Sequence, residues 1–381
     1  MDSNWKAYAL GDLLSYEQPT PYIVESTEYS GSYKTPVVTA GKTFILGYTN
    51  EEHGIYDALP VIIFDDFTTA SKYVNFKFKV KSSAMKILTA NTELVLPKFI
   101  FYRMHIINFD ASTHKRYWIQ HYSKIKVKVP PIPEQGRIVA HIEELLSQLD
   151  SSVNELKMAK DRLKVYRQAV LEEAFEGDYP QIQLKEISNA IGGYAFKSKL
   201  YAPTGKYVVV KIGNVKERYL DFSRDLTYTN ETDGTILDRY LLQCGDCLIT
   251  LTGSRGKRDY GFVTMITDQT NFLLNQRVAA IRFDREKALP EFFQYYLASP
   301  AYRNVFFSYE TGNVGQGNVG IKALTEPTVI LPNIEQQRQI VEKIESHLSV
   351  CDSIEKTVDT ALQQAEALRQ SILKKAFEGE L

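Results

Sequence analysis

The residues of this chain that are best suited to chemistry do not form a catalytic or metal-binding pattern. Cys244 and Cys247 make a C-x-x-C, but no second cysteine pair or histidine pair at ligand spacing accompanies it, and it lies in an apolar, strand-like run. Asp65 and Asp66 end another apolar strand without a Glu-x-Lys at useful spacing, so we expect them to stabilise a turn. The alternative is a free-standing Mg²⁺-dependent nuclease that uses these two aspartates.

Motifs for nucleotide binding and for methyl transfer are also incomplete. Residues 315–320 match G-x-G-x-x-G, but a dinucleotide site needs a preceding strand, an opening helix and an acidic residue about 20 positions further on. No Walker A lysine follows a Gly-rich stretch, and the Asn/Asp-Pro-Pro-Tyr/Phe tetrapeptide of adenine methyltransferases does not occur. The sequence therefore predicts a binding protein with no catalytic residues and with no metal or cofactor of its own.

Polar and cationic loop residues are suited to contacting DNA, because Arg, Lys, Asn, Gln, Ser and Thr side chains reach base edges and phosphates. In the second half of the chain we select as candidates Ser254, Arg255, Lys257, Arg258, Asn275, Gln276, Arg277, Asn313, Gln316 and Asn318. In the first half we select Lys42, Thr43, Thr68, Thr69, Ser71, Lys72, Ser82, Ser83 and Arg116, the last within the segment 114–118. For each of them a solvated turn is the alternative interpretation.

Two long helical segments must position these loops. Residues 138–177 and 340–379 align without a gap at an offset of about 202, share about 16 identical positions, and both end in Ala-Phe-Glu-Gly. Apolar residues recur in both at about every 3.5 positions over about five heptads, which is the period of a coiled coil. We expect the two helices to pair antiparallel within the chain. The alternative is that each helix pairs with another chain.

The remaining sequence has the pattern of two β-rich units. We expect domain boundaries at 1–132, 133–178, 179–332 and 333–381, in which the second and fourth segments are the helices. Alternation of apolar residues predicts strands over 59–64, 74–80, 123–129, 207–212, 246–251, 261–266 and 278–283. Short helices are predicted over 98–108 and 290–299, and a Gly-rich loop over 311–320.

Composition limits the class of protein. The 381 residues carry a formal net charge of −1, no apolar run is long enough to span a bilayer, and the N-terminal sequence lacks a signal-peptide pattern. Both β-rich stretches have a small excess of Lys and Arg, and both helical stretches have an excess of Asp and Glu, so a polyanion would contact the β-rich stretches. Three cysteines without a pairing pattern favour a reducing cytoplasm.

The chain resembles the specificity (S) subunits of type I restriction-modification systems. The resemblance rests on the helix lead-ins 129–139 (VPPIPEQGRIV) and 331–341 (LPNIEQQRQIV), on the two Ala-Phe-Glu-Gly endings, and on 242–254, where Gly245-Asp246 is followed by Thr252-Gly253-Ser254. The second lead-in lacks the second Pro. In the first unit Asp65-Asp66 stands where we expect the equivalent of Gly245-Asp246.

The resemblance implies an α+β protein with two target-recognition domains separated by a pair of long antiparallel coiled-coil helices, an internal pseudo-two-fold repeat. Each domain would recognise half of a bipartite DNA target, and the helices would set the spacing. Two methyltransferase subunits and motor-nuclease restriction subunits would dock on the chain, and S-adenosylmethionine, ATP and Mg²⁺ would belong to them. The alternative from another class is a coiled-coil scaffold that assembles proteins without sequence-specific DNA recognition.

Overall fold

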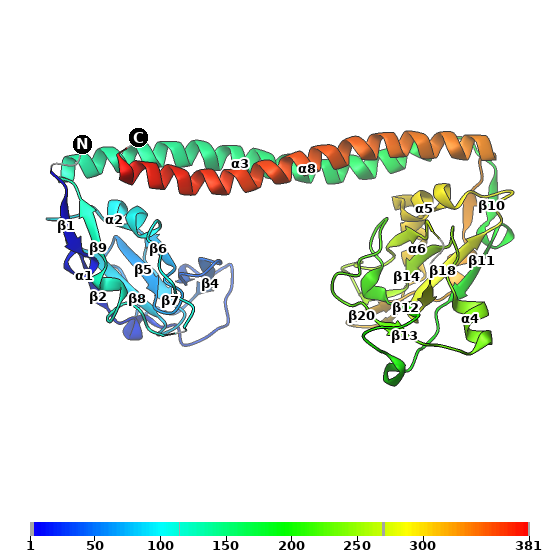
Figure 1. The fold of residues 1–381 in the computed structure, drawn as a ribbon, viewed down its shortest axis with the longest axis horizontal. Coiled ribbons are helices and arrows are strands. Elements are labelled where there is room, and N and C mark those ends of the chain that lie inside the picture. The colour runs from blue at the N-terminus through cyan, green and yellow to red at the C-terminus, as the bar shows by residue number, and fades with distance from the viewer. Residues whose placement is uncertain (1–3, 114, 269–270, 380–381) are drawn as a thin grey trace. The chain divides into compact units, whose positions relative to one another are not determined.

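The computed structural model describes residues 4–113, 115–268 and 271–379. Two compact units are formed: unit 1 comprises Met1–Lys157 and Asp359–Leu381, and unit 2 comprises Met158–Val358. The two long helices, α3 (Ile132–Ala174) and α8 (Ile334–Glu378), each contribute one part to each unit (Figure 1). The long helices and the α+β class expected from the sequence are confirmed. Among the described residues, none of the helices combines the length and apolar character that a bilayer crossing demands.

Unit 1 is built on a four-stranded antiparallel sheet. In spatial order this sheet contains β2 (Leu14–Glu17), β8 (Met85–Ala90), β5 (Val61–Asp65) and β6 (Ser71–Val74). A second sheet contains, in order, β4 (Ile45–Thr49), β3 (Thr35–Val38) and β7 (Lys79–Val80). Val61 and Ile63 pack with the second sheet, whereas Ile62 and Phe64 pack with helix α2 (Pro97–Met104). Strand β5 is a continuous apolar run because both of its faces are buried.

Unit 2 repeats this plan with a different sequence. Its main sheet has the order β11 (Ser188–Gly192), β18 (Val278–Phe283), β14 (Cys247–Thr250) and β16 (Val263–Met265). Two smaller sheets have the orders β13 (Tyr228–Thr229), β12 (Tyr207–Val210), β17 (Phe272–Leu274), and β15 (Thr252–Ser254), β20 (Gln316–Asn318), β19 (Thr311–Asn313). In each main sheet the strand that comes first in the chain, β2 or β11, lies beside the strand that comes last in the chain, β8 or β18. The two main sheets therefore share a topology.

The remaining elements connect these sheets to the long helices. Strand β1 (Lys6–Ala9) pairs antiparallel with β9 (Lys126–Val129), and β10 (Gln181–Gln183) pairs with β21 (Thr328–Ile330). The other helices are α1 (Leu10–Leu13), α4 (Gly234–Tyr240), α5 (Pro290–Ala298), α6 (Pro300–Ser308) and α7 (Lys322–Thr325). Short 3-10 turns are η1 (Thr20–Tyr22), η2 (Tyr122–Lys124), η3 (Leu184–Glu186), η4 (Ser198–Leu200) and η5 (Ile212–Asn214).

Most of the expected strands and short helices are present, but the single strand expected over 74–80 is wrong. The first strand of this segment, β6, ends at Val74 in the main sheet, and β7 begins at Lys79 in the second sheet. Val74, Phe78 and Val80 are all fully buried in the core between the two sheets. The apolar alternation therefore reports burial correctly, although the chain crosses from one sheet to the other partway along it.

In unit 2 the long helices pair antiparallel, as expected from the repeat. Glu173 bonds Lys343 at 2.8 Å, and Arg167 contacts Asp352 at 2.5 Å and Glu355 at 2.7 Å. Residue numbers thus rise along α8 while they fall along α3 (Figure 1). Apolar residues from both helices join the core beneath them, namely Leu171, Ala174, Ile340, Val341, Ile344 and Leu348.

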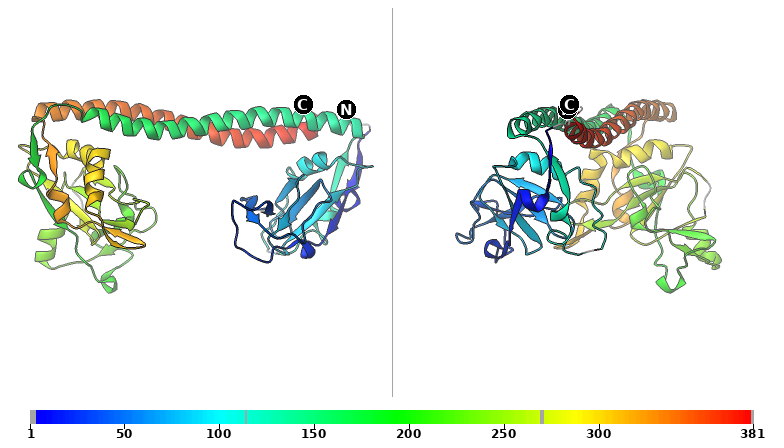
Figure 2. Two further views of the ribbon diagram at one scale, coloured as in Figure 1. Left: turned by 180° about the vertical axis from the view of Figure 1, so that it is seen from behind. Right: turned by 60° about the vertical axis from the view of Figure 1, so that its left-hand side comes forward.

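Unit 1 contains the reciprocal half of this pairing. Arg369 of α8 contacts Asp150 of α3, and these are the repeat positions of Arg167 and Asp352. The apolar residues that both helices supply here are Val139, Ile142, Leu146, Ile372, Leu373, Ala376 and Phe377. Figures 1 and 2 show the two helix segments side by side above α2 and the unit 1 sheets. The same two polar positions of the repeat therefore form the interhelical ion pair in each unit.

A buried glutamine fixes the first turn of each long helix to its unit. The side chain of Gln135 accepts a hydrogen bond from Leu96 N at 2.7 Å and donates to Leu94 O and Pro130 O at 3.0 and 2.8 Å. Gln337, at the equivalent repeat position, accepts from Leu289 N at 2.8 Å and donates to carbonyl oxygens at 2.9 and 2.8 Å. Both glutamines are 0% exposed. We call this arrangement the glutamine clamp.

The phenylalanine of each Ala-Phe-Glu-Gly ending packs against a short helix. Phe175 meets Phe292 of α5 edge to face, with ring centroids 5.4 Å apart. Phe377 meets Phe99 of α2 in the same geometry at 5.2 Å. Phe99 and Phe292 occupy the same position in their helices, two residues after an N-terminal proline. The repeated tetrapeptide therefore completes the core of a different unit in each of its two copies.

Candidate nucleic-acid interface

In unit 2 two candidate segments far apart in sequence form one small sheet. The Gly-rich residues 311–320, expected to be a loop, form the hairpin of β19 and β20 around a turn at Val314 and Gly315. Strand β20 also pairs with β15, so that Ser254 lies opposite Gln316. The chain leaves β15 into the cationic loop 255–258. The expectation of an irregular loop over 311–320 is therefore wrong. The segment forms a hairpin because pairing with a distant strand satisfies the hydrogen-bonding groups of its backbone.

A third candidate segment, 275–277, is connected to the other two through the backbone of Leu251. Leu251 N donates a hydrogen bond to Arg277 O at 2.9 Å, and Leu251 O accepts one from Val319 N at 2.9 Å. The segments 252–258, 275–277 and 311–320 therefore meet at the end of β14, and we call them the unit 2 loop cluster. Candidate residues from three separate parts of the sequence are thus brought together.

The loop cluster is anchored by charged and aromatic side chains that the sequence did not single out. Arg255 donates to Gly312 O at 3.1 Å and lies 3.6 Å from a carboxylate oxygen of Glu310. Tyr260 donates to the other oxygen of Glu310 at 2.5 Å. Burial, followed by this hydrogen bond to Glu310, raises the pKa of Tyr260, so the phenol remains a proton donor. Asp259 accepts a hydrogen bond from Ser254 N at 2.6 Å and fixes the start of the loop.

Glycines in and near the G-x-G-x-x-G match allow the β19–β20 hairpin to pack closely. A Cβ at Gly317 would lie 2.3 Å from a carboxylate oxygen of Glu310 and 2.6 Å from the Tyr260 hydroxyl. Gly312, which lies outside the match on β19, has φ +125°, a conformation that side chains rarely adopt. The segment is not a dinucleotide-binding turn, because its residues 316–318 are strand β20 and the helix that follows, α7, has only four residues. These residues therefore permit close packing of the hairpin on Glu310 and Tyr260.

Alanine at Gly317 is expected to displace the hairpin, whereas alanine at Gly315 is expected to be tolerated. The added methyl at 317 overlaps Glu310 and Tyr260, and overpacking of this kind costs about 1–3 kcal/mol. At Gly315 nothing lies within 4 Å of the added atom. Hydrogen exchange of the β15 and β20 amides should accelerate in Gly317→Ala and stay unchanged in Gly315→Ala. Equal exchange in the two variants would show that the hairpin does not depend on this packing.

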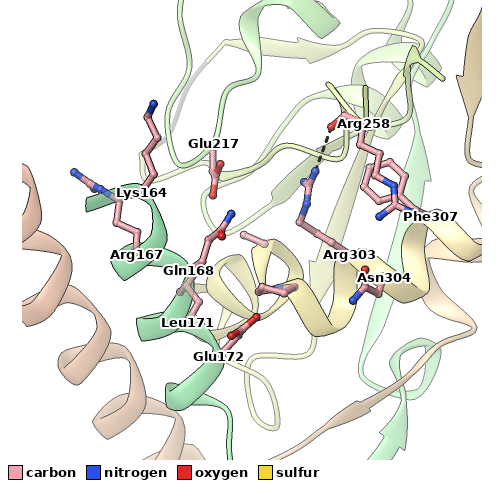
Figure 3. A pocket seen from close by; sticks show the side chains of 12 residues that line it. Lys164, Arg167, Gln168, Leu171, Glu172, Glu217, Arg258, Arg303, Asn304 and Phe307 are labelled. Atoms are coloured by element: carbon pink, nitrogen blue, oxygen red, sulfur yellow. Dashed lines mark hydrogen bonds between the residues drawn. The ribbon is translucent and has the colours of Figure 1, made fainter. Parts of the chain in front are cut away.

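A guanidinium from α6 holds the far end of the cationic loop (Figure 3). Arg303 donates to Gly261 O at 2.7 Å, to Tyr260 O at 3.2 Å and to Arg258 O at 3.4 Å. The ring of Phe307 lies against the guanidinium groups of both Arg258 and Arg303, at 4.9 and 5.1 Å. These side chains, with Glu217 and with Lys164, Arg167 and Gln168 of α3, line a cavity of about 540 Å³. The loop is thus fixed at its end as well as at its start.

Exposure divides the unit 2 candidates into two groups. Asn275 is 7% exposed, and its side chain donates to the Tyr201 hydroxyl at 3.3 Å. The side chain of Ser254, at the end of β15, is half-buried. The exposed candidates are Arg255, Lys257, Arg258, Gln276, Arg277, Asn313, Gln316 and Asn318. The exposed group forms the candidate surface, whereas Asn275 and Ser254 stabilise its base.

Unit 1 gathers its candidates around the end of β5. Asp65 accepts hydrogen bonds from Phe67 N and Thr68 N at 2.9 Å each, so the turn role expected for it is confirmed. Asp66 N donates to Ala84 O, and Tyr117 N donates to Asp66 O, both at 2.9 Å. These bonds bring together the turns that contain Thr68, Thr69, Ser82, Ser83 and Arg116, the last lying 5.7 Å from the Phe67 ring.

The other unit 1 candidates lie elsewhere on the two sheets. Lys42 and Thr43 are exposed in the turn between β3 and β4. Lys72 is half-buried on β6, and Ser71 is 8% exposed beside it, so Ser71 is left out of the candidate surface. His114, in the segment with Arg116, lies outside the described residues.

Asp66 is the buried partner of a lysine, and it does not correspond to Asp246. Its carboxylate lies 3.4 Å from Lys86 Nζ and accepts Trp118 N at 2.7 Å. Asp246 precedes β14 and binds Arg282 through two bonds of 2.8 Å, whereas Asp66 follows β5, the equivalent strand. The expectation that Asp65-Asp66 replaces Gly245-Asp246 is therefore wrong. The two pairs stand at opposite ends of equivalent strands.

The cysteines of the C-x-x-C have different surroundings. Cys244 donates to Thr267 O at 3.1 Å, whereas Cys247 is fully buried on β14 and donates to Pro290 O at 3.5 Å. Burial raises the pKa of the Cys247 thiol far above its ordinary value. In the described part of the chain no three His, Cys, Asp or Glu residues are grouped as metal ligands.

Known proteins resemble this chain over most of its length. The profile of the family described as "Type I restriction modification DNA specificity domain" matches residues 2–160 and 176–364. The EcoR124I/EcoR124II specificity subunit of Escherichia coli is 33% identical, over 91% of this chain and 87% of that protein. The MjaVIII specificity subunit of Methanocaldococcus jannaschii is 24% identical, over 90% of this chain and 86% of that protein.

Solved structures agree in fold. A chain from a structural study of complex assembly and conformational transition in the type I R-M system superposes with a TM-score of 0.73 at 19% identity, covering 100% of this chain and 99% of that one. The HsdS subunit of Thermoanaerobacter tengcongensis gives a TM-score of 0.53 at 17% identity, covering 100% and 98%. At these identities the structures support the architecture, and the sequence matches support the family.

Proposed function

This chain belongs to the type I restriction-modification DNA specificity family, and from that premise we propose that it recognises a bipartite DNA target, with one half-site contacted by each unit. The unit 2 loop cluster is the observation that supports this most directly. It places guanidinium, ammonium and amide groups from three segments on one anchored surface, which is the chemistry that phosphates and base edges require. Because the unit 1 surface is built from different residues, we expect the two half-sites to differ.

We propose that α3 and α8 act as the spacer between the half-sites and as the docking surface for two methyltransferase subunits. Motor-nuclease restriction subunits would join the same assembly. The reciprocal Arg–Asp pairs support a stiff spacer, because they fix the register of the two helices in each unit. Two recognition surfaces on one stiff support would demand half-sites at a fixed separation along the duplex.

We propose that the chain is non-catalytic and acts in the cytoplasm, and that S-adenosylmethionine, ATP and Mg²⁺ belong to its partners. The residues with catalytic potential have structural roles: Asp65 caps a turn, Asp66 pairs with Lys86, and Cys247 is buried with a raised pKa. All three cysteines are free thiols, which fits a reducing compartment.

The test of this function is the methylation pattern of the assembled complex. Coexpression with its methyltransferase subunits, followed by mapping of methylated adenines across a genome, should give a motif of two unlike halves at a constant spacing. Exchange of residues 179–332 for those of a relative with a different target should change one half and leave the other intact. A continuous motif, or a motif in which both halves change, would contradict the proposal.

Alanine at Lys257 is expected to weaken DNA binding by a similar factor on all sequences. Lys257 is exposed in the cationic loop, and the removal of one phosphate-binding cation should reduce the slope of log K against log salt by about one unit. Lys185 is an exposed lysine of unit 2 outside the loop cluster, so Lys185→Ala is the matched control. Titrations of DNA at several salt concentrations measure the slope. Binding without salt dependence would favour the scaffold alternative.

A further inference from the structure

Val314, at the tip of the β19–β20 hairpin, is the most exposed large apolar side chain among the described residues. It is 99% exposed, and the next, Val165, is 66% exposed. No sequence motif draws attention to it, because a lone valine in a Gly-rich segment has no pattern of its own. A branched aliphatic side chain held fully in water at the tip of an ordered hairpin is suited to a contact with another molecule.

The hairpin presents this side chain on a fixed support. Strand β20 is paired on both sides, with β15 and with β19. Beneath it, Glu310 receives the Tyr260 hydroxyl and faces Arg255, which in turn donates to Gly312 O. Only Asn313 therefore separates Val314 from Gly312, whose backbone carbonyl is held by the guanidinium group of Arg255. The sheet therefore fixes the position of the turn before any other molecule binds to it.

The surroundings of Val314 identify the kind of partner. Its neighbours Asn313 and Gln316 are exposed amides, and Gly315 adds no side chain. Arg255 and Lys257 lie at the exit of β15, the strand that pairs with this hairpin. A protein partner would require a wider apolar patch, whereas a single methyl-bearing side chain among amides and cations fits a DNA groove. In the major groove the apolar group available for such a contact is the 5-methyl of thymine.

We propose that Val314 enters the major groove at the half-site contacted by unit 2 and packs against the 5-methyl group of one thymine. This assignment rests on the proposed function and adds a specificity-determining residue to it. The amides on either side would bond base edges while the cations contact phosphates. Discrimination of that thymine from other bases would then depend on the apolar contact made by Val314.

The test combines a change in the protein with a change in the DNA. Once the methylome has given the target, each thymine of the unit 2 half-site is replaced in turn by uracil, which lacks only the 5-methyl group. The complex with the unaltered chain should lose affinity on the order of fourfold at one position, as expected for one buried methyl. The complex with Val314→Ala should bind the thymine duplex more weakly by a similar factor and show no difference between thymine and uracil there.

A second valine of unit 2 supplies the control. Val305→Ala removes the same atoms from a partly exposed valine on α6, and it should discriminate thymine from uracil as the unaltered chain does. If Val314→Ala keeps that discrimination at every position, or weakens binding without altering it, the proposal is overturned. If no two-part motif is methylated at all, it is the proposed function that fails. Thermal unfolding of Val314→Ala should match that of the unaltered chain, because the side chain is fully exposed.

Discussion

Alanine in place of Gln337 is expected to destabilise unit 2 by about 3 kcal/mol or more. The side chain is 0% exposed and satisfies three backbone groups, Leu289 N, Lys287 O and Pro332 O. Each buried group left without a partner costs about 1–3 kcal/mol. Because Leu289 is the N-cap residue of α5, its freed amide also loosens the start of that helix. Denaturant unfolding and hydrogen exchange of the Leu289 amide measure the loss.

Two further substitutions make the test of the glutamine clamp specific. Gln337→Glu is nearly isosteric, but it replaces the donor that faces two carbonyl oxygens by an acceptor, so it should be at least as damaging as alanine. Gln339→Ala is the control, because Gln339 lies two residues away, is exposed and has one contact of 3.5 Å. It should change the unfolding free energy by no more than about 0.5 kcal/mol. Similar results for residues 337 and 339 would refute the clamp.

Asparagine in place of Asp66 is expected to destabilise unit 1 by about 3–5 kcal/mol. Lys86 is 1% exposed, and without the Asp66 carboxylate its ammonium group keeps two neutral neighbours, the amide oxygen of Gln18 at 2.9 Å and the ring of Tyr16 at 5.9 Å. Removal of one partner leaves an uncompensated buried charge, which accounts for a cost of this size. The amide oxygen of asparagine can still accept Trp118 N, so the effect isolates the charge.

The double variant Asp66→Asn with Lys86→Met should recover much of this loss, because no charge is then left buried. The exposed pair of Asp57 and Lys77, with side chains 64% and 70% accessible, supplies the control. Asp57→Asn should change stability by less than about 1 kcal/mol. Equal effects of Asp66→Asn and Asp57→Asn, or a double variant as unstable as the single one, would contradict this account. The free energy of unfolding of each variant is measured by denaturant unfolding, followed with a unit 1 probe such as exchange of the Trp118 amide.

The regular parts of the fold could be predicted from the sequence because their signals are local. The duplicated helices and the strand over 278–283 follow from apolar periodicity. The repeat also placed Asp150, Arg167, Asp352 and Arg369 at equivalent positions, which the structure joins into two reciprocal pairs. Antiparallel pairing could be inferred from the sequence because the connection between the helices favours that closure.

The candidate site was less predictable because it depends on pairing between distant residues. No local pattern indicates that Ser254 lies opposite Gln316, so the Gly-rich hairpin was expected to be a loop. The role of Glu310 under that hairpin and of Arg303 behind the cationic loop likewise depends on tertiary contacts. Asp65 and Asp66 were misaligned with Gly245 and Asp246 because short acidic pairs at strand ends look alike in sequence. Topology distinguishes them, since each pair stands at a different end of its strand.

The position of the second Ala-Phe-Glu-Gly copy has a consequence for synthesis on the ribosome. The unit 1 core contains Ile142 and Leu146, but also Leu373 and Phe377. These later residues are made roughly 230 positions after the earlier ones, which at cellular elongation rates is a delay on the order of 10–50 s. During that interval the nascent α3 displays an uncovered apolar stripe, on which a chaperone would act. The core of unit 1 is therefore completed only after residues 373–377 have been synthesised.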